Sequence, residues 1–300
     1  VRSDHDERGN EMTDASEPTS QSAADEPVVG LLSEQFAAVR ALADEVPDEA
    51  WAGPTDLPGW TVQDCFSHMI GVERGMLGHS EDTPSVDHLA HVDDDFSRMV
   101  EAPVELRRSR TPAEVRAELH DTLAERQRAL EGFGSEKFDE ESWTPAGPDT
   151  YRDFMVIRLF DLGMREQAVR RARDRPGHLS GPVVASVLAN NAGKALPLVV
   201  GKRADAPIGA VVAIDVVGPT EASFVVQVND VSGKKRAALI DPGSSGNPTA
   251  TVEVDVDTFM RLCGGRVGAA SLFEAPPDAV TLGGDVTLGR AVVNNLAFTP

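Results

Sequence analysis

Apolar residues recur at helical spacing through the first half of the chain. Leu32 and Phe36 begin a series spaced three or four positions apart, which predicts a helix that ends before Pro47. A second helix is expected after residue 60, because Thr61 precedes Asp64 by three residues, as in a capping box with Asp in the place of Glu. In this second helix, His68 lies next to the apolar stripe rather than on the opposite face.

Two further helices are predicted before residue 176. The segment 111–114, Thr-Pro-Ala-Glu, places a proline at the first helical position and a glutamate that can reach back to the cap. A longer helix is expected from about Tyr151 to Arg173. Residues 81–101 are acidic and contain proline, and they predict a long connecting loop. Four helices joined by long loops indicate a helical bundle.

The second half of the chain has a different pattern. One more helical stretch, 181–200, leads into segments rich in β-branched residues and bounded by turn residues, at 210–217, 222–230, 236–240 and 249–256. These segments predict strands, and 257–266 and 288–298 predict helices, so this half is expected to be an α+β domain.

These patterns divide the chain into four parts. Residues 1–26 hold eight acidic residues and few large apolar ones, which predicts a disordered acidic tail. The helical bundle is expected over 27–176, a connecting helix and linker over 177–205, and the α+β domain over 206–300.

A formal net charge of -21, from 28 basic and 49 acidic residues, predicts a strongly acidic surface. Such a surface repels phosphate backbones and anionic lipids unless a local basic cluster is present. We identify Arg170-Arg171, with Arg173 and Arg175 nearby, as the most basic stretch. The expectation is therefore no nucleic-acid partner and no membrane partner.

The cysteines and the N-terminal sequence bear on the compartment. Cys65 and Cys263 lie far apart in sequence, without the pattern of a disulfide framework or of a zinc site, which indicates a reducing cytoplasm. The N-terminus lacks the apolar stretch of a secretory signal, and no later apolar run approaches the roughly 18 residues of a membrane span. A soluble, cytoplasmic protein is expected.

Candidate chemistry lies on the helix over 151–173. Arg158, Asp161 and Arg165 share one face of it with Phe154. One interpretation is an ion-pair ladder at a helix surface. The other is a site turned toward the interior, which needs a partner from another helix.

His68 is the candidate partner. A histidine and a carboxylate from facing helices could hold a divalent ion with open positions, although two ligands make a weak site. Glu73, Asp64 and Glu166 are possible third ligands, and each is also explained as a solvated or capping residue. Cys65, one turn before His68, could form a nucleophilic pair with it, but a small buried residue is the simpler interpretation. Gly283-Gly284 predicts only a turn before a helix.

Four segments carry a resemblance to a known family: LPGWTVQDCFSHMIGVE (57–73), RLFDLGMREQAVRRA (158–172), GPVVASVLANNAGKALPLVVGKR (181–203) and VTLGGDVTLGRAVVNNLAFTP (280–300). Together they resemble the actinobacterial mycothiol-dependent maleylpyruvate isomerase family, over nearly everything after residue 27. The resemblance implies a DinB-like four-helix bundle followed by a sterol-carrier-protein-like α+β domain.

The resemblance also implies a site. In the family a divalent metal, typically zinc, is held by a histidine on the second helix and by an acidic residue and a histidine on the fourth. His68 and Asp161 match the first two ligands, whereas Arg165 stands where the third is expected. Mycothiol is thought to approach the open position of the metal as a thiolate. Relatives often carry Trp and Asp where this chain has Gly163 and Ala168.

Arg165 has no lone pair that could bind a cation, so the metal site implied by the resemblance lacks one ligand. This difference from the family leads to alternative functional hypotheses. The first is a mycothiol-dependent metalloenzyme, an isomerase or thiol transferase, that acts on a small electrophile with a degraded metal site. The alternative is a non-catalytic binding or regulatory descendant. A lipid carrier acting through the second domain is a weaker third. The implied partners are a small-molecule substrate and a low-molecular-weight thiol.

Overall fold

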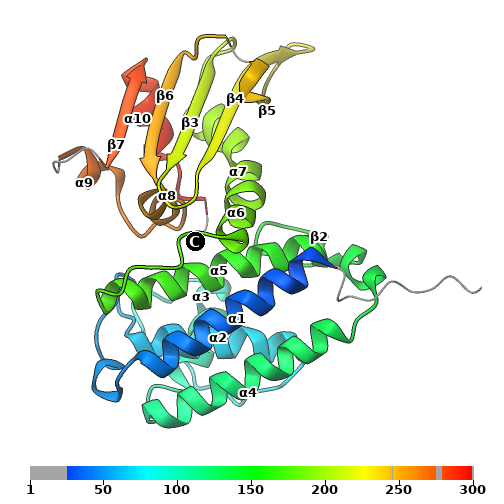
Figure 1. Ribbon diagram of the computed structural model, residues 1–300, viewed down its shortest axis with the longest axis vertical. Coiled ribbons are helices and arrows are strands. Elements are labelled where there is room, and N and C mark those ends of the chain that lie inside the picture. The colour runs from blue at the N-terminus through cyan, green and yellow to red at the C-terminus, as the bar shows by residue number, and fades with distance from the viewer. Residues whose placement is uncertain (1–25, 245, 275–278, 299–300) are drawn as a thin grey trace, which may run out of the picture.

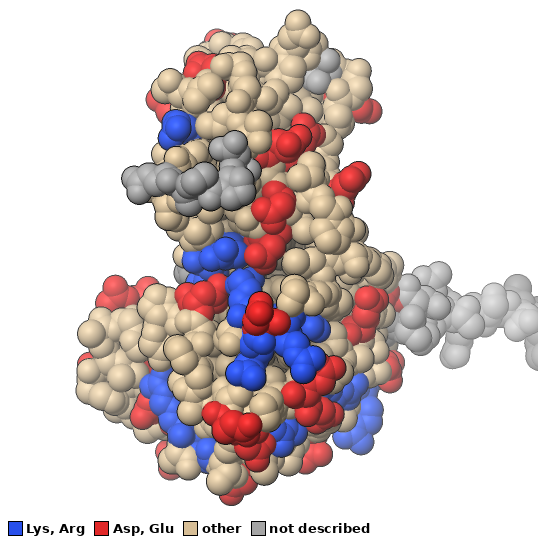
Figure 2. Space-filling model, turned by 60° about the vertical axis from the view of Figure 1, so that its left-hand side comes forward, with Lys and Arg blue, Asp and Glu red and all other residues tan. Residues whose placement is uncertain are grey.

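The computed structural model describes residues 26–244, 246–274 and 279–298. It consists of a helical bundle and a mixed sheet domain, stacked as Figure 1 shows. Acidic side chains lie on both parts of the face shown in Figure 2. The predicted fold class, a helical bundle followed by an α+β domain, is confirmed. The predicted boundaries of the parts stay a prediction. Of the predicted acidic tail, residues 1–25 lie outside the described residues, and Glu26 binds Arg152.

Four long helices form the bundle: α1 (Pro27–Glu45), α2 (Val62–Met76), α4 (Pro112–Glu131) and α5 (Tyr151–Ala172). The predicted helix starts are confirmed, because Thr61 with Asp64 and Thr111 with Glu114 each form a complete capping box. Helix α2 packs against α4 and α5 and is buried along most of its length. The bundle therefore turns side chains of α2 and α5 toward each other.

The prediction of a loop over 81–101 is wrong from Asp95 onward, where helix α3 (Asp95–Glu105) begins. Asp94 and Ser97 form a capping box at its start. Pro84, the proline within the predicted loop, lies before this helix. Pro103 lies in the last turn of α3, where only one backbone hydrogen bond is lost. The loop before α5 also contains a two-residue ladder between β1 (Glu141–Ser142) and β2 (Asp149–Thr150).

A continuous helical stretch, Pro182–Arg203, follows the bundle. It comprises α6 (Pro182–Val187) and α7 (Gly193–Leu198), each continued by a π-helical segment. By length and composition alone this stretch could cross a membrane, so the expectation that no apolar run approaches the length of a membrane span is wrong. Half of its most apolar window is buried inside the molecule, and a core helix passes the same test. The predicted stretch at 181–200 corresponds to it closely.

The sheet has five strands in the order β5-β4-β3-β6-β7. They are β3 (Val211–Val217), β4 (Ala222–Val231), β5 (Lys234–Ile240), β6 (Ala250–Asp255) and β7 (Val280–Gly284). Strands β3 and β6 are parallel, and the other neighbours are antiparallel. Helices α8 (Val256–Cys263), α9 (Ala269–Glu274) and α10 (Val286–Asn294) complete the domain.

The prediction that Gly283-Gly284 forms only a turn is wrong, because both residues pair with β6 at the end of β7. Gly284 has a φ of +64°, and a Cβ there would lie 2.4 Å from the carbonyl oxygen of Thr249. Only glycine fits this close approach, so the same residue that suggests a turn ends a strand here.

Candidate functional site

His68 of α2 and Asp161 of α5 meet inside the molecule. Their Nε2 and Oδ2 atoms are 2.9 Å apart, as the predicted approach of the two helices requires. Trp60 lies beside two residues of the site: its ring centroid is 5.3 Å from that of His68 and 5.3 Å from the Arg165 guanidinium. His68 and Arg165 therefore share an aromatic neighbour.

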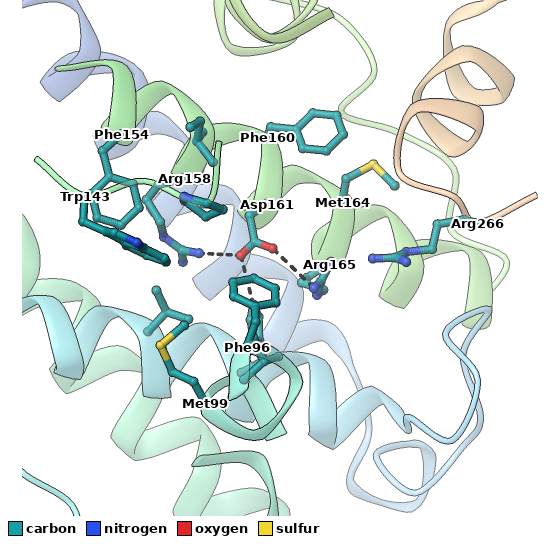
Figure 3. A pocket seen from close by; sticks show the side chains of 15 residues that line it. Phe96, Met99, Trp143, Phe154, Arg158, Phe160, Asp161, Met164, Arg165 and Arg266 are labelled. Atoms are coloured by element: carbon teal, nitrogen blue, oxygen red, sulfur yellow. Dashed lines mark hydrogen bonds and ion pairs between the residues drawn. The ribbon is translucent and has the colours of Figure 1, made fainter. Parts of the chain in front are cut away.

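Both oxygens of the Asp161 carboxylate bind guanidinium groups. Arg158 binds Oδ2, and Nη2 of Arg165 lies 3.3 Å from Oδ1 (Figure 3). The ion-pair ladder considered from the sequence is thus present, but the arginines are only 4% and 8% exposed, so it is an interior feature rather than a surface one.

A second buried carboxylate extends the network. Glu73 accepts from Arg158 at 2.8 Å and from Arg126 of α4 at 3.0 Å. Arg126 also donates to the Tyr151 hydroxyl at 2.6 Å. Because both Glu73 oxygens are engaged by arginines, Glu73 does not act as the missing metal ligand in this arrangement.

Burial and charge set the protonation states of the central pair. Burial lowers the pKa of His68 below its ordinary value, and Asp161 only partly offsets this. Burial alone would raise the pKa of Asp161, but the neighbouring Arg165, His68 and Arg158 outweigh it and hold that pKa well below its usual range. A neutral His68 therefore donates from Nε2 to an ionised Asp161, and its buried Nδ1 has no hydrogen-bond partner in the part of the chain that the structure describes.

The other sequence candidates do not join the site. Asp64 caps α2 and binds Arg108, and Glu166 binds Gln35. Burial raises the pKa of Cys65 to about 12, so this thiol is a buried apolar residue rather than a nucleophile at neutral pH.

Glu166 instead anchors the chain after α5. Its Oε2 atom lies 2.7 Å from Nδ1 of His178, a residue with a φ of +54°. Arg170 binds the other Glu166 oxygen, and the charge of Glu34 also reaches His178. The hydrogen bond to Glu166 raises the pKa of His178 above its ordinary value.

His178→Asn should reveal this contact as a pH-dependent stability difference, since Asn tolerates a positive φ but cannot be protonated. A raised pKa stabilises the fold below about pH 6.5, and this contribution is lost as the pH rises through the folded-state pKa. Thermal unfolding should show the variant melting about 2 °C lower near pH 6, a shift equivalent to roughly 1 kcal/mol. The two proteins should converge above pH 8. A pH-independent difference would contradict a protonated His178.

The residues present do not fit a divalent metal ion. Both oxygens of Asp161 are engaged by arginines, and the expected third position holds Arg165, which cannot coordinate a cation. Across residues 26–244, 246–274 and 279–298, no group of three or more His, Cys, Asp or Glu residues is placed to hold a metal. His68 and Asp161 thus remain a predicted pair of metal ligands. In the structure they bind each other, and Asp161 also binds two arginines.

A pocket with a cavity volume of about 130 Å³ opens beside this network. Its walls are almost entirely apolar and come from α3, the loop before α5, and α5 itself, as Figure 3 shows for Phe96, Met99, Trp143 and Phe154. Trp143 and Met99 are 58% and 54% exposed. Large apolar side chains so exposed at a pocket mouth are typical of a ligand-binding site.

Sequence reasoning missed Arg266, which follows α8 in the sheet domain and points toward Arg165 in Figure 3. Among the described residues no side chain forms a hydrogen bond or ion pair with its guanidinium, and its Nε is buried. Burial lowers the pKa of Arg266 to about 10, and the positive charge of Arg165 acts in the same direction. No local pattern around residue 266 signals this role, because its neighbours come from α5.

The structure combines a helical bundle with a mixed sheet domain, and Arg266 of the sheet domain lines a pocket whose other lining residues come from the bundle. Residues 32–170 match the family model described as the mycothiol maleylpyruvate isomerase N-terminal domain. The resemblance drawn from the sequence is confirmed by this match.

Comparison with solved structures covers more of the chain than the family model does. The mycothiol-dependent maleylpyruvate isomerase is 16% identical, with 82% of this chain and 92% of that chain covered and a TM-score of 0.46. A histidine-to-alanine mutant of that isomerase gives 14% identity, the same coverage and a TM-score of 0.48. Sterol carrier protein 2 from Yarrowia lipolytica, in its apo form, covers 39% of this chain and 94% of its own, with 12% identity and a TM-score of 0.26. No curated protein matches the chain.

Proposed function

We propose that the protein binds a small organic anion in the pocket between its two domains, without a metal ion. The observation that carries this proposal is Arg266, a cation with no carboxylate partner among the described residues, beside Arg165 at an apolar cavity. A buried cation is costly unless it is paired, so an anionic ligand would supply the missing partner.

The charge balance of the network supports an anion. Direct ion pairs join Arg126, Arg158 and Arg165 to the two carboxylates of Glu73 and Asp161, and His68 is neutral. Three positive and two negative charges leave a surplus of one, to which Arg266 adds another. The apolar walls favour a ligand with an apolar body, since they would bury it while the guanidinium groups hold its charged end.

A metal-independent binding or regulatory protein is therefore the function that the geometry supports best. Mycothiol-dependent isomerase or thiol-transferase chemistry on a small electrophile is the second candidate, supported by the family match over residues 32–170. A thiolate is itself an anion, and Arg165 with Arg266 would lower the pKa of a bound thiol by stabilising its charged form. The apolar walls would exclude water from such a thiolate.

Arg266→Gln should weaken anion binding by about 10-fold or more, because a charge-assisted hydrogen bond contributes about 1.5–3 kcal/mol. The probe is 8-anilinonaphthalene-1-sulfonate, titrated by fluorescence in the presence of a chelator. N-phenyl-1-naphthylamine, which has a similar apolar body without the sulfonate, should bind wild type and variant equally.

Arg290→Gln is the matched control, because Arg290 lies over the Phe273 ring and does not line the pocket. It should leave both titrations unchanged. An equal loss of affinity for the sulfonate probe in both variants would refute the proposed site. So would binding of this probe to wild type only when zinc is added.

A further inference from the structure

We propose that the end of the sheet domain far from the bundle docks on an anionic lipid bilayer. In Figure 1 the turn between β4 and β5 lies at this end. The surface concerned, termed the distal patch, combines exposed aliphatic side chains with cations: Leu198, Ile208, Val231, Lys202, Lys234 and Arg236.

The fold brings these residues together from three segments. Leu198 and Lys202 line one surface hollow with Arg236, and its volume is about 400 Å³. The helical stretch reaches β5 because Gly201 packs directly on Ala237, where a Cβ would lie 2.5 Å from the alanine Cβ. Val231 and Lys234 are partners in the β4–β5 ladder. The loop that carries Ile208 is tied to the same hairpin, since Gly209 donates to the Val228 carbonyl.

The charge of the patch is opposite to that of the chain. Lys202, Lys234 and Arg236 are exposed and form no ion pair with any described carboxylate. Lys235 binds Asp205 and is the ladder partner of the exposed Asp230, so these four cations exceed the two nearby carboxylates by two charges. In a chain with 28 basic and 49 acidic residues, unpaired cations gathered at one end provide a local positive field. Acidic residues more than about 10 Å away are largely screened from this surface at ordinary salt concentrations.

The sequence-based expectation of no membrane partner rested on Arg170-Arg171 as the most basic stretch. The run Lys234-Lys235-Arg236 is longer, and folding adds Lys202 to it from a segment about 30 residues away. Arg170 and Arg171 are by contrast paired with Glu166, Asp56 and Asp257.

The apolar members of the patch favour a bilayer over other polyanions. Leu198, Ile208 and Val231 are 45%, 53% and 53% exposed, and no aromatic residue lies in the patch. Aliphatic side chains between cations suit the headgroup layer, where the cations meet lipid phosphates and the side chains enter the acyl boundary. Single-stranded nucleic acids are usually bound with the help of aromatic stacking, which the patch does not offer.

The test is sedimentation of the full chain with vesicles of phosphatidylglycerol and phosphatidylcholine, compared with vesicles of phosphatidylcholine alone. Wild type should bind the anionic vesicles at low salt and be released at high salt. Lys202→Glu, Lys234→Glu and Arg236→Glu together should lower the partition coefficient about 100-fold or more, since each cation near an anionic surface contributes a factor of about 5. The double substitution Ile208→Ser with Val231→Ser should also lower the partition coefficient, but vesicle binding should keep its dependence on salt.

The matched control is Arg128→Glu, Arg173→Glu and Arg175→Glu together. These three bundle arginines are exposed and form no ion pair with any described residue, so the control changes the net charge equally. It should retain vesicle binding, with unchanged circular dichroism in every variant. No binding by wild type, equal loss in both triple variants, or equal binding to neutral vesicles would overturn the proposal. Tighter binding to poly-glutamate than to vesicles would overturn it in favour of an acidic protein partner.

Discussion

Replacing Glu73 with glutamine is expected to lower the free energy of unfolding by about 3–5 kcal/mol. Glu73 is 1% exposed and joins two arginines from different helices, Arg126 of α4 and Arg158 of α5. Removing its charge leaves the network with three guanidinium groups against the single carboxylate of Asp161. The loss is large because a buried charge without compensation keeps its desolvation cost.

Denaturation by urea measures this effect, with Glu140→Gln as the control. Glu140 is an exposed carboxylate that pairs with Lys137, and its loss should change the stability by no more than about 0.5 kcal/mol. If the two variants were equally stable, the buried network would contribute nothing to the bundle, and the charge balance used to infer an anionic ligand would fail with it.

Arg165→His is expected to raise the affinity for zinc by about 100-fold or more over wild type. The substitution removes a fixed positive charge and frees Asp161 Oδ1, whose only partner among the described residues is Arg165. It also supplies an imidazole one helical turn from Asp161, with His68 opposite on α2. Arg158 keeps its second partner, Glu73, so it can release Asp161 at moderate cost.

Calorimetric titration with zinc decides this prediction, and Arg175→His is the matched control. Arg175 is exposed, lies after α5 and does not line the pocket that contains His68 and Asp161, so the new histidine is not added to that pair. The control should bind zinc no better than wild type. A gain in both variants would indicate binding by added histidine alone, and tight binding already in wild type would show that a metal site survives.

Local sequence signals predicted the bundle well because its helices begin at short-range features. The capping boxes at Thr61 and Thr111 require only residues three positions apart, so the sequence contains all the information needed. Helix α3 was missed because the acidic composition of 81–101 and its proline were interpreted as a loop, although Asp94 and Ser97 form a capping box at the start of the helix. The glycines of β7 were likewise interpreted by their usual turn preference rather than by the backbone that approaches them.

The candidate site was predictable in part. The facing of His68 and Asp161 followed from the apolar stripes of two helices and from the family resemblance, and the 2.9 Å contact agrees with it. The roles of Glu73 and Arg266 were not predictable, because each depends on partners in helices far away in sequence. Long-range pairing of this kind leaves no periodic signal in the chain.

Elemental analysis of wild-type protein purified without chelator tests the metal-independent site most directly. We predict zinc and other transition metals at far below one equivalent per chain, with anion binding intact after dialysis against a chelator. The contrary result would be one equivalent of zinc per chain, with anion binding that is lost when the zinc is removed and restored when zinc is added back. That result would contradict a site in which Arg165 and Arg266 provide the positive charge.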